Sequence, residues 1–206
     1  MKPNLKFSKL ATDQQIKRTI KALQDDGFKA EVVASGEEAK KKVLGLIPQG
    51  AEVFTMTSQT LEAVGLAREI NESGKYDSVR QKLNTMDRNT QGREMAKLGA
   101  APEWVVSSVH AVTEDGHLLI ASNTGSQLPA EAYAAGIVIF VVGAQKIVKN
   151  VDSGIRRINE YSYPLEDERA QKAYGMKSGV NKLLIIAKEI NPDRIHVILV
   201  KEKLGF

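Results

Sequence analysis

The spacing of hydrophobic residues predicts that helices and strands alternate along the chain. Ile16, Ile20 and Leu23 are four and three residues apart, which is the spacing of one helix face. Thr12 or Asp13 can cap such a helix at its start, and Gly27 ends it. We therefore expect a first helix that begins at one of these caps and ends before Gly27.

A strand is expected at residues 28–34, followed by a second helix. Ser35 and Glu38 have the spacing of a capping box, and the apolar residues behind them recur at helical intervals until Pro48. A short apolar run at residues 53–56 then leads directly into polar residues. The order of this region is therefore strand, helix, strand and polar turn.

The polar turn is expected to lead into a helical segment at residues 61–70. Residues 71–99 are polar, with only scattered apolar positions, and are mostly helical by composition. From Trp104 the pattern changes to that of strands. The middle of the chain is thus predicted to be mostly helical.

A β-hairpin is expected after Trp104. Two β-rich runs, residues 105–113 and 117–122, flank the pair Asp115–Gly116, and Asp-Gly between such runs is a strong hairpin signal. With that pair as a two-residue loop, Glu114 lies opposite His117.

The rest of the chain predicts a short helix at 129–135, a buried strand at 137–142 and a helix at 151–161. Two further apolar runs, 183–187 and 195–200, are expected to be strands. Alternating strands and helices indicate an α/β fold, and the hairpin indicates a mixed sheet flanked by helices.

Length and composition fit one globular domain. The chain has 206 residues, of which 42% are hydrophobic and 26% charged. These values are far from those of disordered chains. We expect a single domain over residues 1–206, with residues 1–50 as a helical and strand subregion at its amino terminus.

The chain contains no cysteine. Disulfides, thiolate nucleophiles, zinc-thiolate sites and cysteine-ligated iron-sulfur clusters are therefore excluded. The amino terminus lacks the apolar segment of a secretory signal, and the longest apolar stretch, 134–144, is too short for a membrane span. A cytoplasmic protein without a membrane span is expected.

The charge pattern does not indicate nucleic-acid binding. Lys and Arg number 29 against 25 Asp and Glu, and the net charge of +4 is distributed over both halves of the chain. The one compact basic run, residues 40–42, follows two glutamates in a predicted helix, which favours ion pairing on a solvated face.

Two polar turns follow predicted strands, in the place where open α/β sheets bind anions. The first comprises residues 55–60 and the second residues 122–127, where Gly125 permits a positive φ. In each turn the alternative is a purely structural role, with Ser58 as a helix cap or Asn123 satisfying the turn.

Lys146 follows the strand at 137–142 and is a third candidate. It could supply a positive charge to the same ligand, or it could be a surface lysine on a connecting loop. A metal site is not indicated, because His110 and His117 are not cross-strand neighbours in the expected hairpin and His196 lies in another strand.

Four segments of the sequence resemble the LUD domain, the family of lactate-utilization proteins. They are VTEDG at 112–116, SNTGSQL at 122–128, VVGAQKIVK at 141–149 and NPDRIHVILVKEKLGF at 191–206. The order and spacing of the four motifs support the resemblance more strongly than any single motif does. The resemblance extends over most of the chain, from Ser58 to the carboxyl terminus.

The resemblance implies the fold of ribose-5-phosphate isomerase A, glucosamine-6-phosphate deaminase and the CoA-transferases. It also implies a ligand-binding set consisting of Thr57, Ser58, Thr60, Asn123, Thr124, Gly125, Ser126, Gln127 and Lys146. CoA-transferases use a glutamate beside a glycine turn as nucleophile, whereas this chain has Asn123 and Ser126 there, which weakens the case for acyl transfer through a carboxylate.

The resemblance further implies a role in a bacterial system that oxidises L-lactate to pyruvate. Our hypothesis is a component that binds a small anionic metabolite and depends on an iron-sulfur partner subunit, because the chain has no cysteine to hold a cluster. The alternatives are a stand-alone isomerase or transferase acting on a phosphorylated or CoA-linked molecule, and a non-catalytic interaction subunit. The sequence assigns no catalytic residue and no cofactor.

Overall fold

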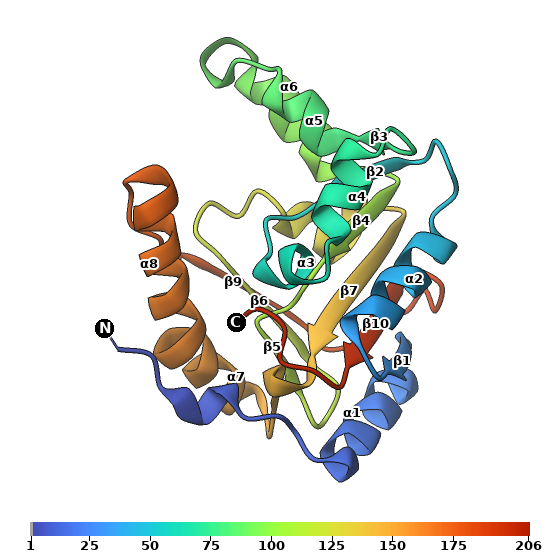
Figure 1. The fold of residues 1–206 in the computed structure, drawn as a ribbon, viewed down its shortest axis with the longest axis vertical. Coiled ribbons are helices and arrows are strands. Elements are labelled where there is room, and N and C mark those ends of the chain that lie inside the picture. The colour runs from blue at the N-terminus through green and yellow to red at the C-terminus, as the bar shows by residue number, and fades with distance from the viewer. Residues whose placement is uncertain (1) are drawn as a thin grey trace.

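A six-stranded parallel sheet forms the centre of the molecule (Figure 1). The computed structural model describes residues 2–206. The strands, in spatial order, are β1 (Lys29–Val33), β10 (Ile195–Val200), β7 (Ile137–Gly143), β4 (Trp104–Ser107), β2 (Glu52–Thr55) and β3 (Asp77–Ser78). The expected α/β class is therefore confirmed.

The central strand β7 is apolar throughout because both of its faces are covered. Val138, Phe140 and Val142 belong to one hydrophobic cluster, whereas Ile139 and Val141 belong to another on the opposite face. A continuous apolar run is the sequence pattern of such a doubly covered parallel strand.

Helices cover both faces of the sheet. They are α1 (Asp13–Asp25), α2 (Gly36–Leu46), α3 (Gln59–Ala63), α4 (Leu66–Glu72), α5 (Val79–Asn84), α6 (Arg88–Ala100), α7 (Val151–Arg157) and α8 (Tyr163–Tyr174). The apolar residues of α1 join the cluster on one face, and those of α2, α3 and α4 join the cluster on the other. No helix within residues 2–206 is long and apolar enough to cross a membrane.

Four short helical segments complete the fold. They are η1 (Leu5–Ser8), the π-helical turn η2 (Ala130–Ala134), η3 (Ala144–Lys146) and the π-helical turn η4 (Ile158–Ser162). The expected short helix at 129–135 corresponds to η2. The helix expected at 151–161 continues through η4 into α8, so the charged residues 166–169 are helical.

A second, four-stranded sheet packs against the central one. Its strands, in spatial order, are β8 (Ile147–Val148), β5 (Ala111–Thr113), β6 (Leu118–Ser122) and β9 (Lys182–Ile186). β5 runs parallel to β8 and antiparallel to β6, so the mixed strand directions expected from the hairpin occur in this smaller sheet. Apolar side chains of β5 and β6 share one cluster with the central sheet.

The single strand expected at residues 105–113 is wrong. The chain leaves the central sheet after Ser107, at the end of β4, and joins the second sheet at Ala111, at the start of β5. Both halves are buried and rich in β-branched residues, so periodicity cannot reveal where the chain passes from one sheet to the other.

The hairpin is confirmed, but its register is shifted by one residue. Val112 pairs with Leu118, and the Thr113 amide donates to the His117 carbonyl at 2.9 Å. The loop therefore has three residues, Glu114–Gly116, and Gly116 adopts φ +95°. A three-residue loop that ends in a left-handed glycine is the next most common hairpin after the two-residue type, and the Asp-Gly pair suits both.

The helix expected at 61–70 is interrupted. α3 ends at Ala63, α4 begins at Leu66, and Gly65 between them has φ +68°. Periodicity continues across the break because Leu61, Leu66 and Ile70 all lie in the same hydrophobic cluster. The interruption places a short α3 directly after the polar turn that follows β2.

Candidate functional site

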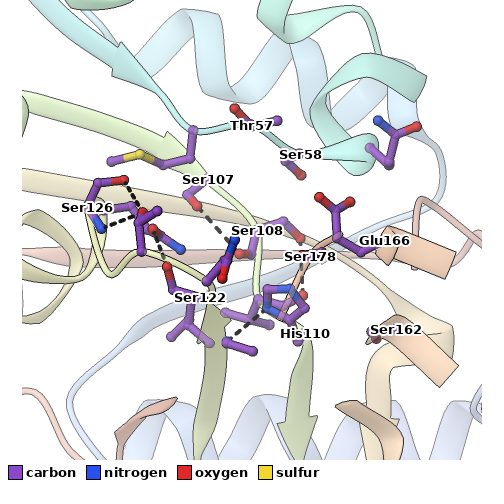
Figure 2. A pocket seen from close by; sticks show the side chains of 18 of the residues that line it. Thr57, Ser58, Ser107, Ser108, His110, Ser122, Ser126, Ser162, Glu166 and Ser178 are labelled. Carbon is purple, nitrogen blue, oxygen red and sulfur yellow. Dashed lines mark hydrogen bonds between the residues drawn. The ribbon is translucent and has the colours of Figure 1, made fainter. Parts of the chain in front are cut away.

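A cavity of about 430 Å³ lies at the carboxyl ends of the central strands. Its wall comes from the turns after β2 and β4, the loop after β6, Lys146 after β7, and α8. Figure 2 shows hydroxyl side chains from these segments around His110. This is the edge at which open α/β sheets bind ligands.

Eight of the nine residues expected to bind a ligand line this one cavity. They are Thr57, Ser58, Thr60, Asn123, Thr124, Ser126, Gln127 and Lys146. The ninth, Gly125, does not line it and shapes the turn with φ +86°. The two turns, which are more than 60 residues apart in the sequence, thus share one site.

The turn after β2 leads directly into α3, and Ser58 caps this helix at its start. The hydroxyl of Ser58 accepts from the Thr60 amide at 3.2 Å as a helix cap, and its own O–H has no partner within residues 2–206. Thr57 is exposed, whereas Thr60 is buried and donates to the Leu204 carbonyl at 3.1 Å. Thr57 and Ser58 are therefore available to a ligand, and Thr60 is held by the fold.

The loop after β6 is held in shape by its own side chains. The hydroxyl of Ser122 accepts from the Gly125 amide at 2.8 Å and donates to the Gln127 side-chain carbonyl at 3.0 Å. Thr124 donates to the Ser126 hydroxyl at 3.2 Å. The loop is therefore preorganised, with exposed hydroxyl and amide groups at its tip.

Lys146 is neither a surface lysine nor a free charge. Its side chain is buried, and its ammonium group donates to the Thr60 hydroxyl at 2.9 Å, the Ser108 hydroxyl at 3.1 Å and the Val109 carbonyl at 3.0 Å. The three N–H groups are therefore all used. Burial, and then the positive charge of Arg157, lower the pKa of Lys146 well below its usual value.

Glu131 is a buried carboxyl group in the cavity wall that the sequence did not suggest. Its Oε1 accepts from the Ser107 hydroxyl at 2.7 Å, and its Oε2 has no protein partner within residues 2–206. Burial raises the pKa of Glu131 to about 8, although the Ser107 hydrogen bond opposes this shift. Glu131 is therefore mostly protonated at neutral pH.

Three arginines, Arg80, Arg88 and Arg169, line the cavity. Arg80 donates to the Thr55 carbonyl at 2.6 Å and lies over the Phe54 ring, 4.9 Å from its centroid. Arg88 is exposed at the start of α6. Arg169 is neutralised by two hydrogen bonds of 2.7 Å to Glu166.

Arg80 and Arg88 form no ion pair within residues 2–206, since neither guanidinium lies within 4.0 Å of a carboxylate there. Within the same residues, no three His, Asp or Glu side chains gather closely enough to hold a metal ion. The free charge of the cavity therefore suits an anion.

The profile of the LUD domain matches residues 16–200. Among solved structures, the chain is similar to a DUF162-family protein from Deinococcus radiodurans. The two share 13% sequence identity with a TM-score of 0.56, over 93% of this chain and 99% of the other. No curated protein matches the chain.

The chain is an α/β protein whose central parallel sheet has a polar cavity at the carboxyl ends of its strands. The chain belongs to the LUD domain family, which is associated with lactate utilization.

Proposed function

We propose that this protein binds a small anionic metabolite in the cavity and serves as one component of a lactate-oxidising assembly. The observation that carries the proposal is the convergence of the turns after β2 and β6 on one cavity that also contains Arg80 and Arg88. Hydroxyl, amide and guanidinium donors are the groups that bind carboxylates and phosphates.

The lack of cysteine indicates that the electrons released from lactate would need an acceptor outside this chain. Oxidation of lactate to pyruvate releases two electrons and two protons, and the chain has no cysteine with which to hold an iron-sulfur cluster. We therefore propose that an iron-sulfur partner subunit accepts the electrons, while this chain contributes the anion site. A cytoplasmic location fits this role.

Titration calorimetry with L-lactate, pyruvate, inorganic phosphate and coenzyme A tests the proposal. Binding of one of these anions is expected, and a Ser58→Ala/Asn123→Ala double variant should weaken it about 10-fold because two cavity donors are lost. Asn159→Ala is the matched control, since Asn159 is exposed and does not line the cavity. Absence of binding by all four anions would contradict the proposal.

A stand-alone isomerase or transferase is the second candidate. It is favoured by two buried titratable groups in one cavity, because burial lowers the pKa of Lys146 and raises the pKa of Glu131. Turnover of a sugar phosphate by the isolated protein, lost in Lys146→Ala with the fold intact by circular dichroism, would support this candidate over the first.

A further inference from the structure

His110 lies in the segment that connects the two sheets, between β4 and β5, and both of its main-chain polar groups form hydrogen bonds. Its amide donates to the Leu119 carbonyl at 2.9 Å, and its carbonyl accepts a hydrogen bond from Arg157. The imidazole is half-buried and lines the cavity (Figure 2). The ring therefore has a fixed location at the cavity wall.

The hydrogen bond to the ring defines where its proton lies. The Ala121 amide donates to Nδ1 of His110 at 3.1 Å. A backbone N–H is always a donor, so Nδ1 must present a lone pair and the proton of the neutral ring must be on Nε2. Nε2 has no hydrogen-bond partner within residues 2–206.

Burial and two nearby positive charges keep this ring neutral. Burial, followed by the charges of Lys146 and Arg157, lowers the pKa of His110 to about 3. Across the cavity, the carboxylate of Glu166 is paired with Arg169. No carboxylate within residues 2–206 contacts the His110 ring, so no anion favours an imidazolium there.

We propose that the Nε2–H of His110 donates a hydrogen bond to a carbonyl or carboxylate oxygen of a small organic acid bound in the cavity. This inference rests on the proposed anion site and specifies its ligand as an oxygen acceptor. With its proton on Nε2, the ring polarises and orients that oxygen, and it does not take up a proton from a substrate hydroxyl.

Two variants of His110 test the roles of its two ring nitrogens separately. His110→Asn places a carbonyl oxygen near the position of Nδ1 and keeps the acceptor for Ala121, but its amide falls short of the cavity. His110→Gln reaches toward the position of Nε2 with an amide donor. We expect pyruvate affinity, measured by calorimetry, to fall about 10-fold in His110→Asn and to be largely retained in His110→Gln.

Nitrogen NMR of protein labelled in its imidazole groups tests the ring itself, without a ligand. The expected spectrum shows His110 protonated on Nε2 and unchanged between about pH 5 and about pH 8, where an ordinary histidine titrates. A ring that titrates in that range, or that carries its proton on Nδ1, overturns the inference.

The two measurements also separate this inference from the proposed function. If the wild-type protein binds pyruvate and His110→Asn binds it equally well, the inference is wrong and the anion site stands. If the wild-type protein binds none of the four anions, the proposed function fails and takes the ligand role of His110 with it, whatever the NMR spectrum shows.

Discussion

The ammonium group of Lys146 donates a hydrogen bond of 2.9 Å to the hydroxyl of Thr60, which is 86 residues earlier in the sequence. Thr60 in turn donates to the Leu204 carbonyl at 3.1 Å. One chain of hydrogen bonds thus joins the turn after β2, the segment after β7 and the carboxyl-terminal residues that follow β10. These two hydrogen bonds connect three segments that contribute residues to the cavity wall.

Lys146→Met should therefore destabilise the protein. The change leaves the buried Ser108 hydroxyl and Val109 carbonyl without one of their donors, and we expect a loss of about 2–4 kcal/mol in the free energy of unfolding. Urea denaturation measures it. Lys149→Met is the control, because Lys149 is exposed three residues away. Equal stability of the two variants would show that the buried contacts contribute little.

Gly125→Ala tests the shape of the loop after β6. Its φ of +86° is strained for any residue with a Cβ, and the new atom would lie 2.5 Å from Cδ of Lys182. We expect a loss of about 1–2 kcal/mol in thermal or urea denaturation.

Gly45→Ala provides the opposite case. Gly45 lies in α2, and a Cβ there would meet no atom within 4 Å. This variant should gain about 0.5–1 kcal/mol from helix propensity. If both glycine variants shift stability in the same direction, the positive φ does not explain the role of Gly125.

Glu131 should make stability depend on pH. Its pKa is raised from 4.5 to about 8 in the fold, so between these values the native state binds a proton that the unfolded chain has released. The free energy of unfolding should therefore fall by up to about 1.4 kcal/mol per pH unit as pH rises through this window, and the Glu131 contribution is constant outside it.

Glu131→Gln removes this titration and keeps an acceptor for the Ser107 hydroxyl. Urea denaturation between about pH 5 and about pH 8 should show a shallower decline for the variant than for the wild type. The slope is the informative quantity, because the new amide is itself buried and costs stability at every pH. Identical slopes would mean that Glu131 is ionised in the native state.

Arg80→Met should weaken anion binding. The guanidinium lies over the Phe54 ring and donates to the Thr55 carbonyl at 2.6 Å, and its other N–H groups form no protein hydrogen bond within residues 2–206. Calorimetry with pyruvate and with inorganic phosphate should show about a 10-fold loss of affinity. Arg93→Met, an exposed change on α6 outside the cavity, should bind as the wild type does.

Local pattern alone predicted many of the elements. The apolar spacing of Ile16 and Leu23 predicted α1, and the uninterrupted apolar run of β7 predicted a buried strand. The polar turns around Ser58 and Asn123 were site candidates because each follows a predicted strand, and the resemblance to the LUD domain agreed with that choice. These predictions succeed because periodicity and turn chemistry are set by residues that are close in the sequence.

Other features of the protein depend on tertiary structure and could not be predicted from the local sequence pattern. The passage from the central to the second sheet after Ser107, the burial of Lys146 against Thr60, and the cavity positions of His110 and Glu131 all depend on contacts between distant segments. Burial and hydrogen-bond partners set the charge state of these side chains, and neither quantity is encoded in neighbouring residues. The sequence by itself determined which polar groups could bind an anion, and only the fold determined which of them face one cavity and which are held within the wall.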